Sequence, residues 1–215
     1  MNNLALRRTL GKKSISGKYQ TAVVYKGYIY RSIDYGVTWS PVGNIYSWRG
    51  VSMSSDGKYQ TAVVYNGYIY RSIDYGVTWS PVGNSNNWLG VSMSSDGKYQ
   101  TAVVSSGIIY RSIDYGVTWS PVGNSKYWNG VSMSSDGKYQ TAVVDNGYIY
   151  RSIDYGVTWS PVGNSNNWLG VSMSSDGKYQ TAVVYGGIIY RSTDYGVTWS
   201  PVGNSYSWRG VAINK

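Results

Sequence analysis

The chain of 215 residues contains no cysteine, no histidine, no glutamate and no phenylalanine. Without cysteine there is no disulfide framework and no thiol chemistry, and the redox compartment is left open. Without histidine and glutamate, the side chains that most often serve general acid–base catalysis are missing. Every carboxylate side chain is an aspartate, and all of these except Asp145 lie in turn motifs. The composition therefore argues against an enzyme that depends on a tuned acid–base pair.

Long apolar runs are also absent, so we expect no membrane partner. Residues 1–13 lack the apolar stretch of a secretory signal, which makes a cytoplasmic location the default expectation. The net charge is +9, but residues 1–16 hold four of these charges and are expected to form a basic tail. The remaining positive charge is spread over the chain, whereas nucleic-acid binders usually concentrate it in a stripe. No nucleic-acid partner is expected.

What the chain does have is a forty-residue unit that occurs five times without insertion or deletion. Each copy carries the string Ser-x-Asp-x-Gly-x-Thr-Trp, which begins at Ser32, Ser72, Ser112, Ser152 and Ser192. A fixed period in this range indicates stacked supersecondary units. Because nearly identical copies mostly describe their own architecture, function has to be sought where the copies differ.

The second unit reads as four short strands, over residues 48–55, 58–65, 68–72 and 78–82. These segments alternate in polarity or are rich in β-branched and aromatic residues. Asn66-Gly67 between the second and third strands is a strong hairpin signal. Proline removes a ladder donor and is confined to edge strands, so the fourth strand is predicted to be an outer edge. All prolines of the chain lie in this strand: Pro41, Pro81, Pro121, Pro161 and Pro201.

Four-stranded antiparallel meanders that repeat at this period are typical of β-propeller blades. The string Ser72-Ile-Asp74-Tyr-Gly76-Val-Thr78-Trp79 resembles the Asp box of bacterial-neuraminidase-repeat (BNR) propellers, the family of sialidases and sortilin-type receptors. The resemblance covers about residues 17 to 214. It implies a structural turn in which the carboxylate accepts backbone hydrogen bonds, the glycine allows the bend and the tryptophan packs between sheets. The aspartates concerned are Asp34, Asp74, Asp114, Asp154 and Asp194.

The chain enters at a second strand, residues 18–24, and leaves just after a first strand, residues 208–214. We therefore expect an all-β fold, a five-bladed β-propeller in which the C-terminal strand completes the first blade. Such closure would hide the strand edges that an open array exposes. It makes residues 17–215 a single domain and the chain a monomer. The pairing of two chains into one larger ring is the alternative.

The copies differ in two places, the turn between the second and third strands and the connection between units. In a meander these two connections share one face of the disc, so the diversity is predicted to lie on that face. Its polar and aromatic side chains suit a glycan or a peptide ligand. Neutral drift of exposed loops is the alternative explanation. The candidate ligand-binding residues are Tyr46, Trp48, Arg49, Asn86, Asn87, Trp88, Lys126, Tyr127, Trp128, Asn166, Asn167, Trp168, Tyr206, Trp208 and Arg209.

Two sets of unvarying residues have competing interpretations. The five tryptophans from Trp48 to Trp208 could form a glycan-binding ring, but packing between blades is favoured because a tryptophan buries a large area. The arginine before each box, as at Arg71, does not match the sialidase arginine triad, because those arginines occupy non-equivalent positions. We expect these arginines to pair with carboxylates or to stack on Tyr30-type rings. One carboxylate per box is too few for a hard cation, so no metal or other cofactor is expected.

Three functional classes follow. A sialidase-type glycoside hydrolase needs a tyrosine nucleophile with its glutamate and a separate acid, and the chain lacks these parts. A non-enzymatic binding module, lectin-like or protein-binding, is the favoured hypothesis. The third class is a symmetric scaffold without an evolved ligand, recently amplified or engineered, which the near-identity of the copies supports.

Overall fold

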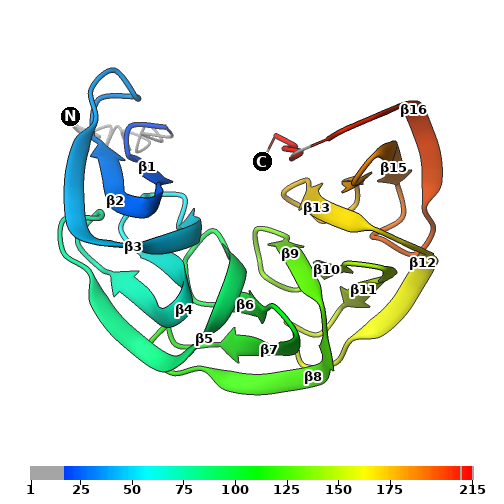
Figure 1. Cartoon of the computed structure of the whole chain (residues 1–215), viewed down its shortest axis with the longest axis horizontal. Coiled ribbons are helices and arrows are strands. Elements are labelled where there is room, and N and C mark those ends of the chain that lie inside the picture. Colours follow the sequence, from blue (N-terminus) through cyan, green and yellow to red (C-terminus); the bar gives the residue numbers. More distant parts are fainter. Residues whose placement is uncertain (1–16, 209, 215) are drawn as a thin grey trace, which may run out of the picture.

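The structure is a computed structural model that describes residues 17–208 and 210–214; the predicted basic tail lies outside them. All regular secondary structure in this part of the chain is β-strand. One eight-stranded sheet runs in the order β1 to β8, and two four-stranded sheets follow, β9 to β12 and β13 to β16. Figure 1 shows the units following one another around an arc, with β1 near one end and β16 near the other. None of the described segments is a helix that could cross a membrane.

The first sheet contains the longest strands. Its members are β1 (Gln20–Val23), β2 (Tyr25–Ser32), β3 (Ser40–Met53), β4 (Gln60–Ser72), β5 (Ser80–Met93), β6 (Gln100–Val104), β7 (Gly107–Ser112) and β8 (Ser120–Lys126). The second sheet contains β9 (Trp128–Met133), β10 (Gln140–Val144), β11 (Gly147–Ser152) and β12 (Ser160–Asn166). The third contains β13 (Trp168–Met173), β14 (Gln180–Val184), β15 (Gly187–Ser192) and β16 (Ser200–Tyr206).

The second and third sheets each show one complete antiparallel meander. In the second, Thr141 of β10 pairs with Ser132 of β9 on one side and with Arg151 of β11 on the other. Pro161 lies on β12, the last strand of its sheet, opposite Tyr150. The predicted position of the prolines on an outer edge strand is thus confirmed in this meander.

The sequence suggested a loop between the first two units, but the structure has a continuous strand there. β3 is 14 residues long and joins the outer strand of one meander to the inner strand of the next. Its middle stays extended because it pairs with the preceding hairpin, Tyr46 with Gly27 and Ser47 with Tyr25. β5 has the same length and makes the same connection. After β8 and β12 the strand is interrupted by one residue, at Tyr127 and Asn167.

The core lies between neighbouring units and is centred on a tryptophan. Trp88 packs against Val63 and Ile69 of one unit and against Ala102 and Val104 of the next. Equivalent clusters surround Trp128 and Trp168. Burial of such apolar area is the main favourable term in folding, so each tryptophan fixes two units against each other.

Polar contacts join neighbouring units at the opposite end of the strands. Thr61 Oγ1 donates to Gln100 Oε1 at 2.6 Å, and the Tyr59 and Tyr115 rings lie 4.8 Å apart. Arg71 Nε donates to the backbone oxygen of Tyr115 at 2.6 Å. This last contact corrects the expectation that these arginines pair with carboxylates or stack on Tyr30-type rings. The Arg71 guanidinium bonds the backbone carbonyl that the turn of the next unit directs toward it. The acid of that turn, Asp114, accepts hydrogen bonds from the amide and the hydroxyl of Thr118 instead.

Completion of the first blade by the C-terminal strand is not seen in the described residues, and it stays a prediction. β1 is paired with β2, and residues 210–214 have no strand assignment. The backbone nitrogen of Ile213 donates to Ser172 Oγ on β13 at 3.0 Å. Val24, in the first unit, is 44% exposed, whereas its equivalent Val64 is 4% exposed. The structure therefore shows antiparallel sheets in a propeller-like arrangement, with the inner surface of the first unit uncovered.

Candidate ligand-binding face

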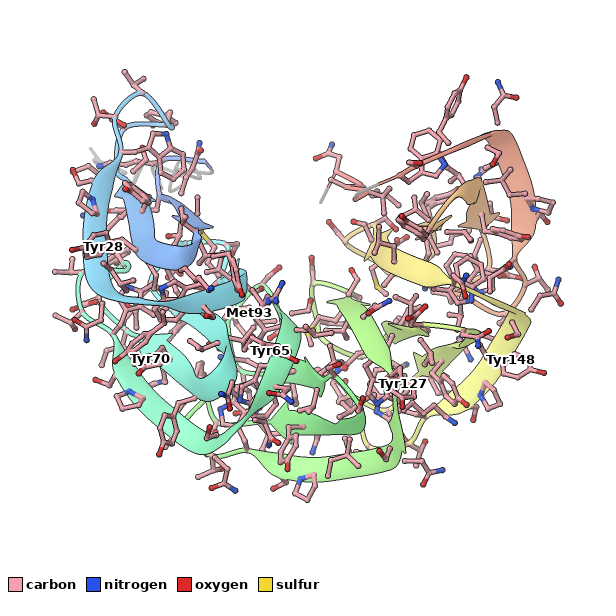
Figure 2. The ribbon with its side chains drawn as sticks, viewed as in Figure 1. Tyr28, Tyr65, Tyr70, Met93, Tyr127 and Tyr148 are labelled. Carbon is pink, nitrogen blue, oxygen red and sulfur yellow. The ribbon has the colours of Figure 1, made fainter. Side chains whose placement is uncertain are left out.

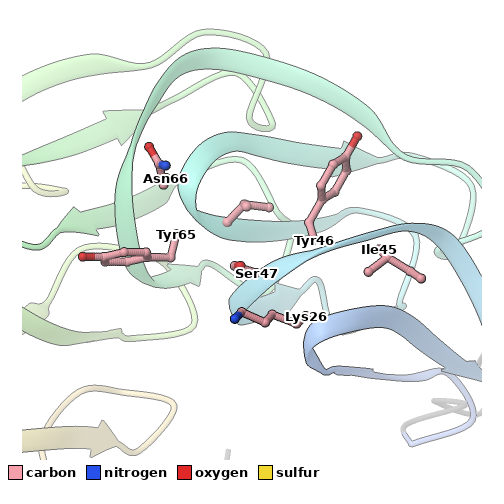
Figure 3. Close-up of a pocket in the computed structure, with 7 residues that line it drawn as sticks. Lys26, Ile45, Tyr46, Ser47, Tyr65 and Asn66 are labelled. Carbon is pink, nitrogen blue, oxygen red and sulfur yellow. The ribbon is translucent and has the colours of Figure 1, made fainter.

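The two variable kinds of segment come together around shared cavities. A cavity of about 410 Å³ is lined by residues from three strands. Lys26 comes from β2, Tyr46 and its neighbours Ile45 and Ser47 come from β3, and Tyr65 comes from β4 with Val64 and Asn66. Figure 3 shows these side chains around the cavity. The hairpin turns and the connections between units thus form one surface, as the meander topology led us to expect.

A second and a third cavity repeat this arrangement further along the arc. The second, about 400 Å³, is lined by Lys126, Tyr127, Asp145 and Tyr148 among others. The third, about 370 Å³, also includes Asp145, together with Asn129, Asn167 and Tyr185. Figure 2 shows Tyr65, Tyr127 and Tyr148 at successive places along the arc. We call the surface that contains these three cavities the variable face.

Predicted ligand residues alternate between half-buried and exposed positions, as expected for an extended backbone. The half-buried ones are Tyr46, Asn86, Lys126 and Asn166. The exposed ones are Arg49, Asn87, Tyr127, Asn167 and Tyr206. Arg209 lies outside the described residues. The exposed set is free to contact a ligand, and Tyr127 is the most open of its aromatic members at 63%.

The tryptophans do not belong to this exposed set, and the structure corrects their assignment as ligand residues. Their side chains are at most 2% exposed at Trp48, Trp88, Trp128 and Trp168. Each of these rings fills the space between two units, so the packing alternative is the one that holds. Trp208 is half-buried, and its Nε1 donates to the Gly187 oxygen at 2.9 Å.

The Asp boxes are closed hydrogen-bonded turns, in agreement with the role that the family resemblance implied. Asp74 accepts from the Thr78 amide at 3.0 Å, from the Thr78 hydroxyl at 2.6 Å and from the Ser72 hydroxyl at 2.8 Å. Gly76 supplies the bend with a φ of 79°. Trp79 Nε1 donates back to the Gly76 oxygen at 3.2 Å. Most of the acceptor sites of this carboxylate are therefore occupied within its own turn.

These hydrogen bonds lower the pKa of the box aspartates. At Asp34 the Thr38 hydroxyl is the largest cause, and the pKa falls to about 2. At Asp194 burial alone would raise the pKa, but hydrogen bonds from Thr198 and Ser192 outweigh it and bring the pKa to about 2. An acid–base catalyst needs a pKa near the working pH, so these carboxyls are poor candidates. In the described residues no three metal-ligating side chains come together.

Asp145 is the one carboxylate of the described residues on the variable face. It lines the second and the third cavities. Lys126 stands near it in the second cavity, with its Nζ 5.1 Å from the Tyr150 ring centroid. This part of the face therefore carries both signs of charge beside tyrosine rings.

Several lining residues were not among the predicted ligand residues. Lys26, Tyr65 and Asp145 belong to hairpin turns whose variation was visible in the sequence and could have been used. Tyr150 could not have been found in this way, because its equivalents are tyrosine in every unit. Only the side-chain packing places that ring against Lys126.

Fold and face together define a repeat β-propeller-like protein with one uniform and one variable surface. The chain carries the BNR/Asp-box repeat, which is matched over residues 190–201. The other four units contain the same string, apart from isoleucine at the Thr193 position. No curated protein sequence matches the chain.

Solved structures match the chain at low sequence identity. An ancestral GH74 enzyme has a TM-score of 0.71 at 13% identity, covering 88% of this chain and 30% of that one. The GH74 enzyme of Niastella koreensis has a TM-score of 0.67 at 18% identity, covering 86% and 29%. YCF48 bound to D1 peptide has a TM-score of 0.48 at 16% identity, covering 86% and 78%. The chain thus spans less than a third of the GH74 enzymes, and the similarity to them concerns the fold.

Proposed function

We propose that this chain is a non-enzymatic binding module whose variable face holds a glycan or a peptide. The observation that carries the proposal is that side chains from two separate variable segments line the same cavities. Tyrosine rings beside asparagine and lysine side chains offer stacking and hydrogen bonding to one ligand. A lectin-like role fits this chemistry best.

The chemistry of the carboxylates supports a role without catalysis. Glycoside hydrolysis commonly uses a pair of carboxyl groups on either side of the scissile bond. On the variable face of the described residues, Asp145 is the one carboxylate, and the box aspartates are saturated by hydrogen bonds at the other end of the strands. A glycoside hydrolase is therefore the weakest of the three classes.

A scaffold without an evolved ligand is the second candidate. It is favoured by identical stretches within the variable segments: Asn86-Asn-Trp-Leu-Gly90 recurs unchanged as Asn166-Asn-Trp-Leu-Gly170. Selection for one ligand would be expected to diversify such positions. Ligand binding separates the two candidates, since anything that binds only the folded state raises its stability.

The test is a glycan and peptide array followed by titration of each hit. For a ligand that occupies the second cavity, Lys126→Ala should weaken binding about tenfold. Lys98→Ala is the matched control, because Lys98 also lies beside a tyrosine ring, at 5.3 Å from that of Tyr99, but on the uniform Ser-Asp-Gly-Lys turn. Absence of any hit, or equal loss in both variants, would contradict binding through the variable face.

We further propose that the five units close into one five-bladed ring within a single chain. Support comes from contacts that recur between neighbouring units. At the two ends of the described chain, the residues that would make the same contact have no partner for it. Arg31, Arg71, Arg111 and Arg151 each donate Nε to the backbone oxygen of the next unit's box tyrosine. Arg191 is exposed, and so is Tyr35, whose carbonyl is the equivalent acceptor. Closure would join these two residues.

Exposed apolar side chains in the first unit also support the pairing of the first unit with the C-terminal segment. Ala22 and Val24 are exposed in the first unit, while their equivalents in the other units are buried against a tryptophan. Trp208 is the one remaining inter-unit tryptophan, and Ile213, five residues on, already contacts β13. In a closed ring, Trp208 would cover Ala22 and Val24 as Trp88 covers Ala102 and Val104.

Matched arginine variants test this closure. In a closed ring Arg191→Gln should destabilise the protein as much as Arg151→Gln, by about 1–2 kcal/mol each, because both guanidinium groups bond a backbone carbonyl. The measurement is the free energy of unfolding by denaturant. A cost at Arg151 with none at Arg191 would show that the ends stay apart.

A further inference from the structure

The variable face contains a guanidinium that is held between two tyrosine rings. Arg49 of β3 has its central guanidinium carbon 4.7 Å from the Tyr25 ring centroid and 5.0 Å from the Tyr65 centroid. The three residues come from three successive strands, β2, β3 and β4. All three side chains are exposed. An arginine side chain held between two rings has lost part of its conformational freedom before any ligand binds.

A second cation stands at the same place. Lys26 Nζ lies 5.5 Å from the Tyr25 ring centroid, and Lys26 also lines the adjoining cavity together with Tyr65. Two positive groups thus lie beside the Tyr25 ring and form with Tyr65 one small cluster, and Lys26 shares its cavity with the Asn66 side chain. An anion that reaches both groups would be attracted by both positive charges.

No acid of the described chain neutralises this cluster. Asp34, Asp56 and Asp74 belong to the turns at the opposite end of the strands, and their carboxylates are occupied by serine, threonine and amide donors. Asp145, the acid of the variable face, lines cavities that share no residue with that of Lys26. Within the described residues Arg49 therefore has no carboxylate partner, and its five N–H donors are available to a ligand.

We propose that Tyr25, Lys26, Arg49 and Tyr65 form a binding site for an oxyanion group, a sulfate or a carboxylate carried by an acidic saccharide. The planar guanidinium can bind two oxygens of such a group at once, and the lysine adds a second charge. The exposed tyrosine rings and the side chains of Ser47 and Asn66 offer stacking and hydroxyl partners to the sugar. Within the described residues the equivalents of Arg49 are Leu89, Asn129 and Leu169, so the site occurs once there; the fifth equivalent, Arg209, lies outside the described residues. This inference rests on the proposed function and names the ligand chemistry of one sector of the variable face.

The first test uses inorganic sulfate as the probe. Nuclear magnetic resonance of the ¹⁵N-labelled full chain would follow the amides of Lys26 and Tyr65 and the Arg49 side chain during a sodium sulfate titration. A saturating shift is expected with sulfate and none with sodium chloride at equal ionic strength. Arg49→Gln should raise the dissociation constant at least tenfold, Arg49→Lys by less, and Leu89→Gln should leave it unchanged. Linear shifts that are the same for both salts would overturn the site.

The second test separates the sources of the oxyanion. A sulfated disaccharide, a hexuronate oligosaccharide and an acidic peptide are titrated in the same way. Binding of either saccharide at least tenfold more tightly than sulfate, lost in Arg49→Gln, is expected. Tighter binding of the peptide than of both saccharides would overturn the saccharide assignment. A neutral ligand that depends on Lys126 but not on Arg49 would overturn this inference and leave the proposed binding function intact.

Discussion

The box aspartates give the protein a specific response to acid. The pKa of Asp34 and that of Asp194 are lowered from 3.8 to about 2, and the other three box aspartates are lowered as well. A carboxyl whose folded pKa is depressed contributes stability above its unfolded pKa and loses it as the pH falls through the folded value. Stability should therefore hold from neutral pH to about pH 4 and fall between about pH 4 and pH 2.

Denaturant titrations at a series of pH values measure this response. Asp194→Asn removes one titrating group, so the loss of stability on acidification should be smaller in that variant. If the wild-type protein and Asp194→Asn lost equal stability between pH 4 and pH 2, the box carboxyl would not be a source of the acid response.

The buried tryptophans differ in one hydrogen bond, and this difference is measurable. Trp88 Nε1 donates to the Asn84 oxygen at 3.3 Å, whereas the buried Trp128 Nε1 has no hydrogen-bond partner in the described structure. Trp88→Phe loses this hydrogen bond, while Trp128→Phe removes a donor that has no partner. Trp88→Phe should cost about 1 kcal/mol more than Trp128→Phe in the free energy of unfolding. A greater cost at Trp128 would contradict the hydrogen-bond difference.

At the scale of the element, the hairpins carry local backbone strain. Lys26, Asn66, Ser106 and Asn146 have φ between 51° and 57°, in the left-handed region, and the fifth hairpin has Gly186 at this position. Asparagine tolerates this region, but serine has no such preference. These turns vary in sequence because they are exposed, and only the glycine that follows each of them is kept.

Ser106→Gly should therefore stabilise the protein by up to about 1 kcal/mol, because glycine removes the steric cost of a positive φ. Ser125→Gly is the control: Ser125 is also exposed but lies in β8 with a negative φ, so glycine there should destabilise. Thermal and denaturant unfolding of both variants measure the difference. The same sign of change in both would contradict the assignment of strain to the hairpin.

Element by element, the period and the turn residues predicted the meander and its edge strand. They could not predict that Tyr46 and Ser47 stay in a strand, because that depends on pairing with Gly27 and Tyr25 of the preceding hairpin. Nor could they predict the partner of Arg71, because the acceptor is a backbone carbonyl, which has no sequence signature. The role of the tryptophans was ambiguous for a similar reason. The same ring can stack on a ligand when it is exposed or fill the core when it is buried, and only the structure gives its burial.

At the scale of the whole molecule, closure can be tested with one tyrosine pair. Tyr115 adopts a φ of 62° and stacks on Tyr59 of the preceding unit. Tyr35 adopts a φ of 64°, and its equivalent partner would be Tyr179, which is 45% exposed. In a closed ring Tyr35→Asn should destabilise the protein about as much as Tyr115→Asn, since both lose a stacked ring. In an open arc Tyr35→Asn should be neutral or stabilising, because asparagine relieves the positive φ at no loss of stacking.

The most direct test of the five-unit ring is the solution mass of the purified chain, measured by light scattering on a sizing column. Exposed inter-unit contacts at both ends of one chain can be satisfied by the chain itself or by a second copy. Closure within one chain predicts a single species near 23.8 kDa at every concentration tested. A stable species of twice that mass, or larger species that grow with concentration, would contradict closure within one chain and assign the free ends to contacts between copies.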